Sequence, residues 1–201
     1  MAADSREQDL LSVKYPKLLE TIRTSPVVTE HGGYSFNKYA FGERGRELDT
    51  DLIREIKGGF LEKIEPFRGG FGYIVAPEPG GNQWGLLIAS ELGVALKIVR
   101  TQASGEPEEA IKRQVGGSYY DRNLYFSGLR PGDRAIVIDD VLSSGTTAQI
   151  IVETLNEKGV TVAGVFAIAT KGDGYKKVEE SSGVPIHSLV HLAADGKTLV
   201  P

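Results

Sequence analysis

The chain has 201 residues, of which 40% are hydrophobic and 25% charged, and its formal net charge at pH 7 is −4. These values are typical of one folded domain, and they disfavour a disordered chain, a membrane span or a nucleic-acid surface. Because the chain has no cysteine, it can form no disulfide, thiolate zinc site or cysteine nucleophile.

The first third of the chain predicts a polar start, a flap and a helix. Residues 1–24 are expected to be a polar, helical segment, and the lack of a hydrophobic leader favours a cytoplasmic location. Residues 25–46 are rich in aromatics, glycine and charge, and predict a small irregular or hairpin flap. Residues 51–64 have helical spacing, but Gly58 and Gly59 leave open whether they form one helix or two.

Apolar strand-like runs alternate with helical runs in the rest of the chain. Strands are expected at 73–76, 94–99, 119–126, 135–138, 160–169 and 186–191. Helices are expected at 84–92 and 146–158, with one or two helical turns at 175–180. Such alternation implies crossover connections, so the sequence predicts an α/β fold with a parallel sheet flanked by helices.

The strongest functional signal follows the strand at 135–138, where Asp139 and Asp140 lead into a hydroxyl-rich loop and a helix. Carboxyl ends of parallel strands bind ligands, and the N–H groups of a helix N-terminus bind phosphate. Gly145 lets the backbone approach such a phosphate. Hydroxyl donors come from Ser143, Ser144, Thr146 and Thr147. Each half alone is common as a solvated turn or a helix cap, but together they predict a site for a sugar 5-phosphate.

The segment 135–147 resembles the 5-phosphoribosyl 1-pyrophosphate (PRPP) motif of type I phosphoribosyltransferases, and the likeness covers most of the chain. Within this family the chain is most similar to the archaeal-type purine enzymes, with supporting matches at 25–28, 116–118, 124–129, 132–134 and 171–174. The resemblance implies a phosphoribosyltransferase domain over residues 25–201. It also implies a flap at about 25–46 over the base site and a mobile lid at about 100–118.

The resemblance further implies a purine-salvage reaction in which the ribosyl 5-phosphate of PRPP passes to adenine or hypoxanthine/guanine and pyrophosphate leaves. Asp139 and Asp140 would hold the ribose hydroxyls, and Ser143 to Thr147 the 5-phosphate. Mg²⁺ would be held through PRPP and water, with no direct protein ligand. The pyrophosphate would lie on a loop formed by Glu78, Pro79, Gly80 and Gly81. That loop is alternatively an ordinary helix start.

Basic side chains on both sides of the motif have two interpretations each. Arg100 stands where the family commonly has a basic residue on the pyrophosphate, and the less favoured alternative is a solvated strand end. Lys112 or Arg113, in the lid, would reach the pyrophosphate unless they are solvated charges. Lys171 would donate to an oxygen of the base, or be a surface charge beside Asp173.

The identity of the base stays open at this point. The resemblance places Val141 against the base, and Ser143 where common 6-oxopurine enzymes have an aspartate general base. Archaeal-type, adenine and orotate enzymes also have a small residue there, so Ser143 does not choose among them. Aromatic residues of the flap either stack on the base or form the flap's own core. Trp84, outside the flap, is expected to be a core residue. These flap residues are Phe36, Tyr39 and Phe41.

Two other functions are weighed against the purine enzyme. The first is an orotate phosphoribosyltransferase, against which the loop at 171–174 and the flap argue. The second is a non-catalytic PRPP-sensing regulator that binds DNA, for which the about 24 residues before Ser25 are too few to build a basic module. A homodimer is expected by resemblance, and neither a nucleic acid nor a membrane is expected as a partner. His31, His187 and His191 have no metal-like spacing, and the last two are expected to be strand residues.

Overall fold

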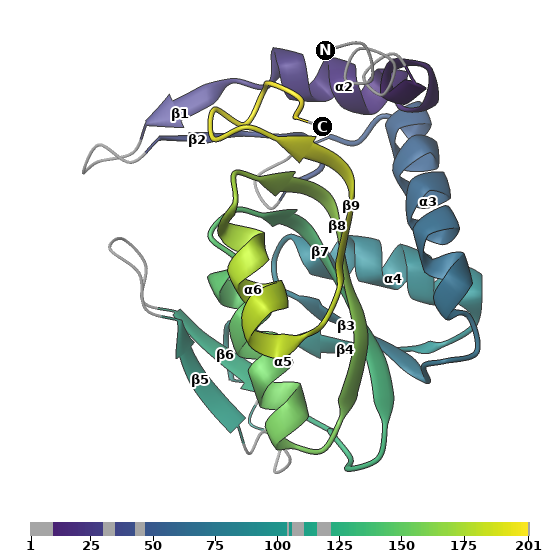
Figure 1. Cartoon of the computed structure of the whole chain (residues 1–201), viewed down its shortest axis with the longest axis vertical. Helices are drawn as coiled ribbons and strands as arrows, with labels where there is room; N and C mark the ends of the chain where they lie inside the picture. The colour runs from purple at the N-terminus through teal and green to yellow at the C-terminus, as the bar shows by residue number, and fades with distance from the viewer. Residues whose placement is uncertain are drawn as a thin grey trace.

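A five-stranded parallel sheet forms the centre of the molecule in the computed structural model, which describes residues 10–29, 35–42, 47–103, 105, 111–115 and 122–200 (Figure 1). The strand order is β4-β3-β7-β8-β9. The strands are β3 (Tyr73–Pro77), β4 (Ala95–Val99), β7 (Arg134–Leu142), β8 (Thr161–Lys171) and β9 (Ile186–Leu192). All four pairings within this sheet are parallel, which confirms the predicted fold class.

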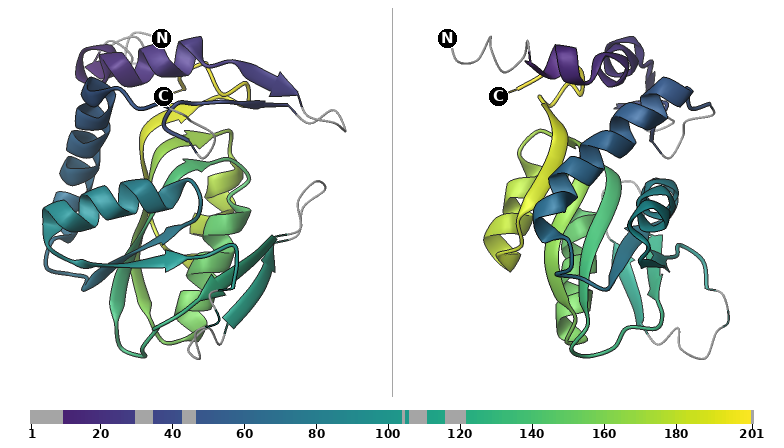
Figure 2. Two further views of the ribbon diagram at one scale, coloured as in Figure 1. Left: turned by 180° about the vertical axis from the view of Figure 1, so that it is seen from behind. Right: turned by 90° about the vertical axis from the view of Figure 1, so that its right-hand side faces the viewer.

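Helices cover both faces of this sheet (Figure 2). They are α3 (Thr50–Ile64), α4 (Gly81–Leu92), α5 (Thr146–Glu157) and α6 (Gly174–Ser182). Side chains alternate between the two faces of a strand, so Ile74 of β3 packs with α3 and α4, whereas Val75 packs with α5. Two apolar layers result, and the central strands are buried on both sides, as parallel strands usually are.

The helix expected at 51–64 is one continuous helix, α3. Gly58 is exposed and has open space around it, whereas Gly59 is buried. A Cβ atom on Gly59 would lie 2.8 Å from Cδ1 of Leu189 and 2.9 Å from the hydroxyl oxygen of Tyr15. Close packing therefore requires the second glycine, and tertiary contacts outweigh the low helix propensity of the pair.

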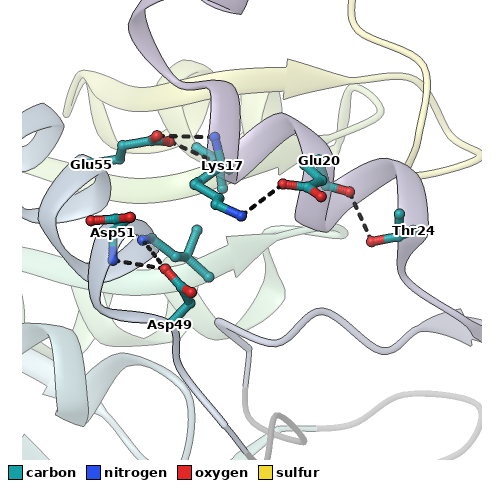
Figure 3. Close-up of polar contacts among 8 residues, drawn as sticks. Lys17, Glu20, Thr24, Asp49, Asp51 and Glu55 are labelled. Carbon is teal, nitrogen blue, oxygen red and sulfur yellow. Dashed lines mark hydrogen bonds and ion pairs between the residues drawn. The ribbon is translucent and has the colours of Figure 1, made fainter.

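The N-terminal part of the described chain is helical at residues 10–14 and in α2 (Pro16–Thr24). Both carboxylate oxygens of Glu55, on α3, accept backbone N–H groups from the first turn of α2, those of Lys17 at 3.0 Å and Leu18 at 2.9 Å (Figure 3). The carboxylate of Asp49 caps α3 itself. One helix thus caps another, which fixes α2 against α3 because free N–H groups at a helix start need acceptors. Residues 1–9 lie outside the described chain.

Two small antiparallel sheets lie apart from the central sheet. The flap contains β1 (Val27–Thr29) and β2 (Ser35–Asn37), and the second sheet contains β5 (Ile111–Val115) and β6 (Arg122–Phe126). The 3-10 helix η1 (Glu65–Phe67) follows α3. Part of the segment expected as a lid is therefore strand β5. The rest of it lies largely outside the described residues, as does His31 of the flap.

Several element boundaries differ from the expected ones. Strand β7 continues to Leu142, four residues beyond the predicted end, because β8 pairs with it as far as the Leu142–Thr170 register. Asp139 and Asp140 thus lie inside a strand. Helix α4 begins at Gly81, three residues before the expected start. Among the described residues, no helix has the length and apolar character needed to cross a membrane.

Candidate functional site

The candidate site lies at the carboxyl edge of the sheet, between β3 and β7. These neighbours are the point at which the strand order reverses, because the chain continues from β3 to β4 on one side and from β7 to β8 on the other. Connections leave such a point in opposite directions and open a crevice for a ligand. Both strands lead through a short loop into a helix, α4 and α5, so two helix N-termini with their free N–H groups face the same region.

The two adjacent carboxylates are held in defined orientations near the end of β7. Oδ1 of Asp139 accepts the backbone N–H of Asp140 at 2.8 Å, and Oδ1 of Asp140 accepts that of Val141 at 2.7 Å. Asp139 is only 7% exposed, whereas Asp140 is partly exposed. Each carboxylate is therefore oriented by the backbone N–H group of the residue that follows it.

Glycines bring the loop after β3 directly against Asp140. A Cβ atom on Gly80 would overlap the Asp140 carboxylate, and one on Gly81 would lie 2.6 Å from the carbonyl oxygen of Ile138. On the flap side, a Cβ atom on Gly42 would lie 3.3 Å from Oδ2 of Asp140. Asp140 therefore lies between the loop after β3 and the flap. Only glycine permits the approach at Gly80, since even a methyl group would displace the carboxylate.

The side chain of Glu78 is bound to the backbone beside it. The Glu78–Pro79 peptide bond is cis, and the Glu78 carboxylate accepts the backbone N–H of Thr101 at 3.3 Å. The Glu78 N–H donates to the carbonyl of Val99 at 2.9 Å. Glu78 thus joins the loop to the end of β4. The part of this loop that can face an anion is therefore its backbone around Gly80 and Gly81, at the start of α4.

The hydroxyl-rich loop after β7 is shaped by close contact with α6. Gly145 has a left-handed conformation (φ 76°) and is the N-cap residue of α5. A Cβ atom on Gly145 would lie 2.8 Å from the carbonyl oxygen of Gly174, and one on Gly174 would overlap that of Ser143. Ser144 and Thr146 hold the start of α5, with 3.0 Å between their hydroxyl oxygens. This loop therefore presents the exposed Ser143 and Ser144 and the partly exposed hydroxyl groups of Thr146 and Thr147 beside a helix N-terminus.

The basic residues expected at the pyrophosphate lie on two segments, the end of β4 and strand β5, which both pair with β6. Arg100 follows β4, has an exposed side chain, and exchanges two backbone hydrogen bonds with Tyr125 of β6, at 3.0 and 2.8 Å. On the opposite side of β6 from Arg100, Lys112 of β5 is the strand partner of Tyr125, and Arg113 is the strand partner of Leu124. The structure describes the backbone of Lys112 and Arg113 and not their side chains. Both interpretations of Arg100 stay open.

Lys171, at the end of β8, bonds to the flap. Its ammonium donates to Oδ1 of Asn37 at 3.2 Å. Asp173 pairs with Lys176 at 2.7 Å, and Lys171 is partly exposed, so both interpretations of Lys171 stay open. Val141 is partly exposed in β7, the neighbouring strand. No local sequence pattern indicates roles for Asn37 and Gly42, because their contacts are with distant segments.

Two aromatic residues of the flap, Tyr39 and Phe41, belong to the main hydrophobic core. Tyr39 and Phe41 are 5% and 0% exposed, and their rings stack on each other with centroids 4.9 Å apart. The buried indole of Trp84 donates to the carbonyl of Phe41 at 2.9 Å, which ties α4 to the flap. Burial also raises the pKa of Tyr39 to about 12, with a smaller contribution from Asp195. Stacking on a base is therefore excluded for Tyr39 and Phe41, whereas Phe36 is partly exposed.

The histidines of β9 are strand residues, as predicted. His187 stacks on Phe166 with centroids 5.0 Å apart, and Nδ1 of His191 lies 2.8 Å from the Thr170 hydroxyl oxygen. Desolvation, followed by the charge of Lys63, lowers the pKa of His187, whereas Glu179 raises it. Within the described part of the chain, no three or more His, Asp or Glu residues gather closely enough to hold a metal ion.

Comparisons with known proteins give consistent results. The family model of the phosphoribosyl transferase domain matches residues 47–186. A hypoxanthine/guanine phosphoribosyltransferase of Methanothermobacter thermautotrophicus is 31% identical over 185 residues, covering 92% of this chain and 93% of the relative. One from Ferroglobus placidus is 30% identical, covering 92% and 96%.

The fold also matches solved structures. Adenine phosphoribosyltransferase from Saccharomyces cerevisiae, crystallised with an imino-altritol bisphosphate and adenine, superposes with a TM-score of 0.70. The match covers 89% of this chain and 99% of that chain. Because only 19% of the residues are identical, this likeness shows a shared fold and does not bear on the base.

Proposed function

The chain belongs to the phosphoribosyl transferase family, and from that premise we propose that it transfers the ribosyl 5-phosphate of PRPP to a purine base, with hypoxanthine or guanine preferred. The products are a nucleoside monophosphate and pyrophosphate. The observation that carries the proposal is the continuous arrangement from Asp139 to Thr147 at the sheet's switch point, with Gly80 pressed against Asp140.

The residues of β7 and the following loop are proposed to hold the ribose phosphate. The carboxylates of Asp139 and Asp140 would accept hydrogen bonds from the vicinal ribose hydroxyls, since a carboxylate is a strong acceptor. Ser143, Ser144, Thr146 and Thr147 would donate hydroxyl groups to the 5-phosphate. Backbone N–H groups at the start of α5, together with its helix dipole, would add to the binding of this anion.

The loop at residues 78–81 and the start of α4 are proposed to face the pyrophosphate. Gly80 and Gly81 leave their backbone without side chains, and the N-terminal end of α4 favours negative charge. Arg100 is placed at the same edge and would add a permanent positive charge. A nitrogen of the base attacks C1 of the ribose while the bond from C1 to pyrophosphate breaks. The bonding pair leaves with the pyrophosphate, and the proton that the base gives up passes to water. Positioning and electrostatic stabilisation would supply most of the rate.

Magnesium fits this site as an ion bound mainly through the substrate. The carboxylate oxygens of Asp139 and Asp140 are of the donor type that a hard cation prefers, and no larger acidic cluster occurs among the described residues. PRPP and water would therefore provide most of its ligands. When bound, magnesium offsets the negative charge that develops on the leaving pyrophosphate.

The preference for a 6-oxopurine is supported by Lys171. This side chain is a hydrogen-bond donor only, and it comes from the carboxyl end of β8, at the same edge as Asp140. A donor there suits the exocyclic oxygen of hypoxanthine or guanine, whereas adenine carries an amino group at that position. The hypoxanthine/guanine enzymes that resemble the chain at about 30% identity support the same choice.

A pyrophosphate-release assay with PRPP and magnesium tests the proposal. Adenine, hypoxanthine, guanine, xanthine and orotate are each supplied as the acceptor. We expect turnover with hypoxanthine or guanine at a kcat/KM well above that of adenine. Turnover with orotate alone would favour the orotate enzyme. Tight PRPP binding with no turnover on any base would favour a regulator, which salt-sensitive binding to duplex DNA would then support. The homodimer, the mobile lid and the cytoplasmic location stay predictions.

A further inference from the structure

The C-terminal residues 193–200 form a compact turn, called the C-terminal turn below. The carboxylate of Asp195 accepts the backbone N–H groups of Lys197 at 2.8 Å and Thr198 at 2.9 Å, and also the Thr198 hydroxyl at 2.6 Å. These bonds to Thr198 and Lys197 lower the pKa of Asp195 to about 2, so this carboxylate is negatively charged at neutral pH. The backbone N–H of Val200 donates to the carbonyl of His191 at 2.9 Å, which joins the turn to the end of β9.

The C-terminal turn packs on the flap (Figure 1, yellow chain beside β1 and β2). The buried hydroxyl of Tyr39 donates to the carbonyl of Gly196 at 2.6 Å. A Cβ atom on Gly196 would overlap Oδ1 of Asn37 and lie 2.6 Å from the Tyr39 hydroxyl oxygen. Gly196 also has a positive φ of 69°. Both the conformation and the contact therefore favour glycine at this position.

Asn37, the last residue of β2, connects this turn to Lys171. Its Oδ1 atom accepts the Lys171 ammonium at 3.2 Å, while its Nδ2 atom is buried and has no hydrogen-bond partner among the described residues. The opposite orientation of the amide would place two donors face to face, so the oxygen must point to Lys171. The Asn37 side chain thus accepts a hydrogen bond from Lys171 and donates none. This is unusual, because a buried amide nitrogen normally has a hydrogen-bond partner.

The charge of Asp195 reinforces this arrangement. Lys171 makes the smallest of the contributions that lower the pKa of Asp195, so the two charges attract each other weakly. The contact that holds the ammonium is its bond to the amide oxygen of Asn37. The flap thus fixes a side chain at the end of β8, and the C-terminal turn packs on the flap residue that does so.

We propose that Asn37 is a positioning residue for base selection: it orients the Lys171 ammonium, and the C-terminal turn at Gly196 holds Asn37 in place. This inference rests on the proposed function, because it assigns base preference to Lys171. It goes beyond that function by making the C-terminal turn part of the base-selecting apparatus, although the turn need not touch the substrate. The PRPP half of the site, built by β7 and its loop, is independent of this chain of contacts.

Two substitutions of Asn37 separate its acceptor from its donor. Asn37→Ala removes the acceptor and should raise the KM for hypoxanthine about tenfold, with the KM for PRPP within about twofold of the wild type. The ratio of kcat/KM for hypoxanthine to that for adenine should fall by a similar factor. Asn37→Asp has nearly the same shape, keeps the acceptor and exchanges the unused donor for a second acceptor oxygen with a negative charge. Because a carboxylate binds an ammonium at least as well as an amide oxygen does, this variant should retain the hypoxanthine preference.

A matched pair of glycine variants tests the C-terminal turn. Gly196→Ala and Gly93→Ala both place alanine at a φ near +68°, and both therefore carry the same backbone strain. Only Gly196 has a side chain in the way, since the space around Gly93 at the end of α4 is open. We expect Gly196→Ala to reproduce the kinetic signature of Asn37→Ala, whereas Gly93→Ala lowers stability and leaves both KM values unchanged.

The outcomes distinguish the inference from the function on which it rests. Wild-type turnover with hypoxanthine, combined with unchanged base KM and base preference in Asn37→Ala, overturns the inference alone. The same holds if Asn37→Asp loses the preference as fully as Asn37→Ala, because then the acceptor is not what matters. A wild-type protein that turns over no base overturns the proposed function and the inference together. If Gly196→Ala does not fold, the Asn37 pair still decides.

Discussion

The part of the candidate site that we propose for the sugar phosphate comes from one continuous stretch of chain, whereas the part that we propose for the base, called the base half below, is assembled from three. Asp139 to Thr147 lie within nine residues of β7, its loop and the first turn of α5. On the base side, Asn37, Lys171 and Gly196 come from the flap, the end of β8 and the C-terminal turn. A continuous segment has its geometry set by local backbone structure, but an assembled one depends on every contact that holds its pieces together. The base half should therefore be the easier half to alter.

The largest effect is expected from Asp140→Asn, in the continuous half. The substitution keeps the shape and the Oδ1 acceptor for the Val141 N–H, and removes the charge that we assign to a ribose hydroxyl. We expect kcat/KM for PRPP to fall at least about 100-fold. The assay is pyrophosphate release, with the thermal unfolding midpoint as the check that the fold is intact. Turnover close to that of the wild type would show that Asp140 does not bind the ribose.

Gly174→Ala tests whether the loop at Ser143 and Ser144 keeps its geometry without its close contact with α6. The new methyl group would overlap the Ser143 carbonyl and lie 2.7 Å from the Cα atom of Ser144, so the loop must shift. A misplaced phosphate loop should lower kcat/KM for PRPP by about 10–100-fold.

The control for that variant is Gly58→Ala. Gly58 is an exposed helical glycine with open space around it. Alanine there should stabilise the protein by about 0.5–1 kcal/mol and leave the kinetics unchanged.

If Gly174→Ala binds PRPP with the affinity of the wild type, the phosphate loop does not depend on its contact with α6.

Tyr39→Phe is a milder perturbation of the assembled half. It removes the hydroxyl that donates to the Gly196 carbonyl and leaves that buried acceptor without this partner. The free energy of unfolding should fall by about 1–2 kcal/mol, as measured by urea titration. The KM for the base should rise a few-fold with the KM for PRPP unchanged, about as large an effect as one neutral hydrogen bond supports. An equal rise in both KM values would contradict the separation of the two halves.

The smallest effect concerns His187, which lies near the start of β9, at the opposite edge from the site. Because burial lowers its pKa below 6.5, the unfolded chain binds more protons than the folded one as the pH falls through 6.5. The contribution of His187 to stability is thus complete above that pH and is lost as the pH falls toward the lowered value.

His187→Phe should flatten this part of the curve of unfolding free energy against pH. Phenylalanine retains the stacking on Phe166, and the buried Nε2 atom has no hydrogen-bond partner among the described residues to lose. Neither KM should change, which makes this variant a baseline for both halves of the site. A curve between pH 7 and 5 that is identical to the wild type would show that His187 does not titrate in this range.

Local sequence patterns predicted the elements of the sheet more reliably than their ends. The acidic pair was expected just after a strand, but pairing with β8 extends β7 over both residues. The glycine pair in α3 weakened the prediction of a single helix, and the close approach of Leu189 and Tyr15 explains why the helix is nevertheless continuous. In both cases a neighbour distant in the sequence decided the outcome.

By itself, the sequence determined the alternating strands and helices, the parallel sheet and the segment from Asp139 to Thr147, because short-range periodicity and one contiguous motif carry that information. Only the tertiary structure decided that Asp140 lies between Gly80 and Gly42, that Tyr39 and Phe41 are core residues, and that Lys171 bonds to Asn37. The contacts of Asp140 and Lys171 join segments between 60 and 134 positions apart. No local pattern encodes them, since they exist only once the core has packed and brought those segments together.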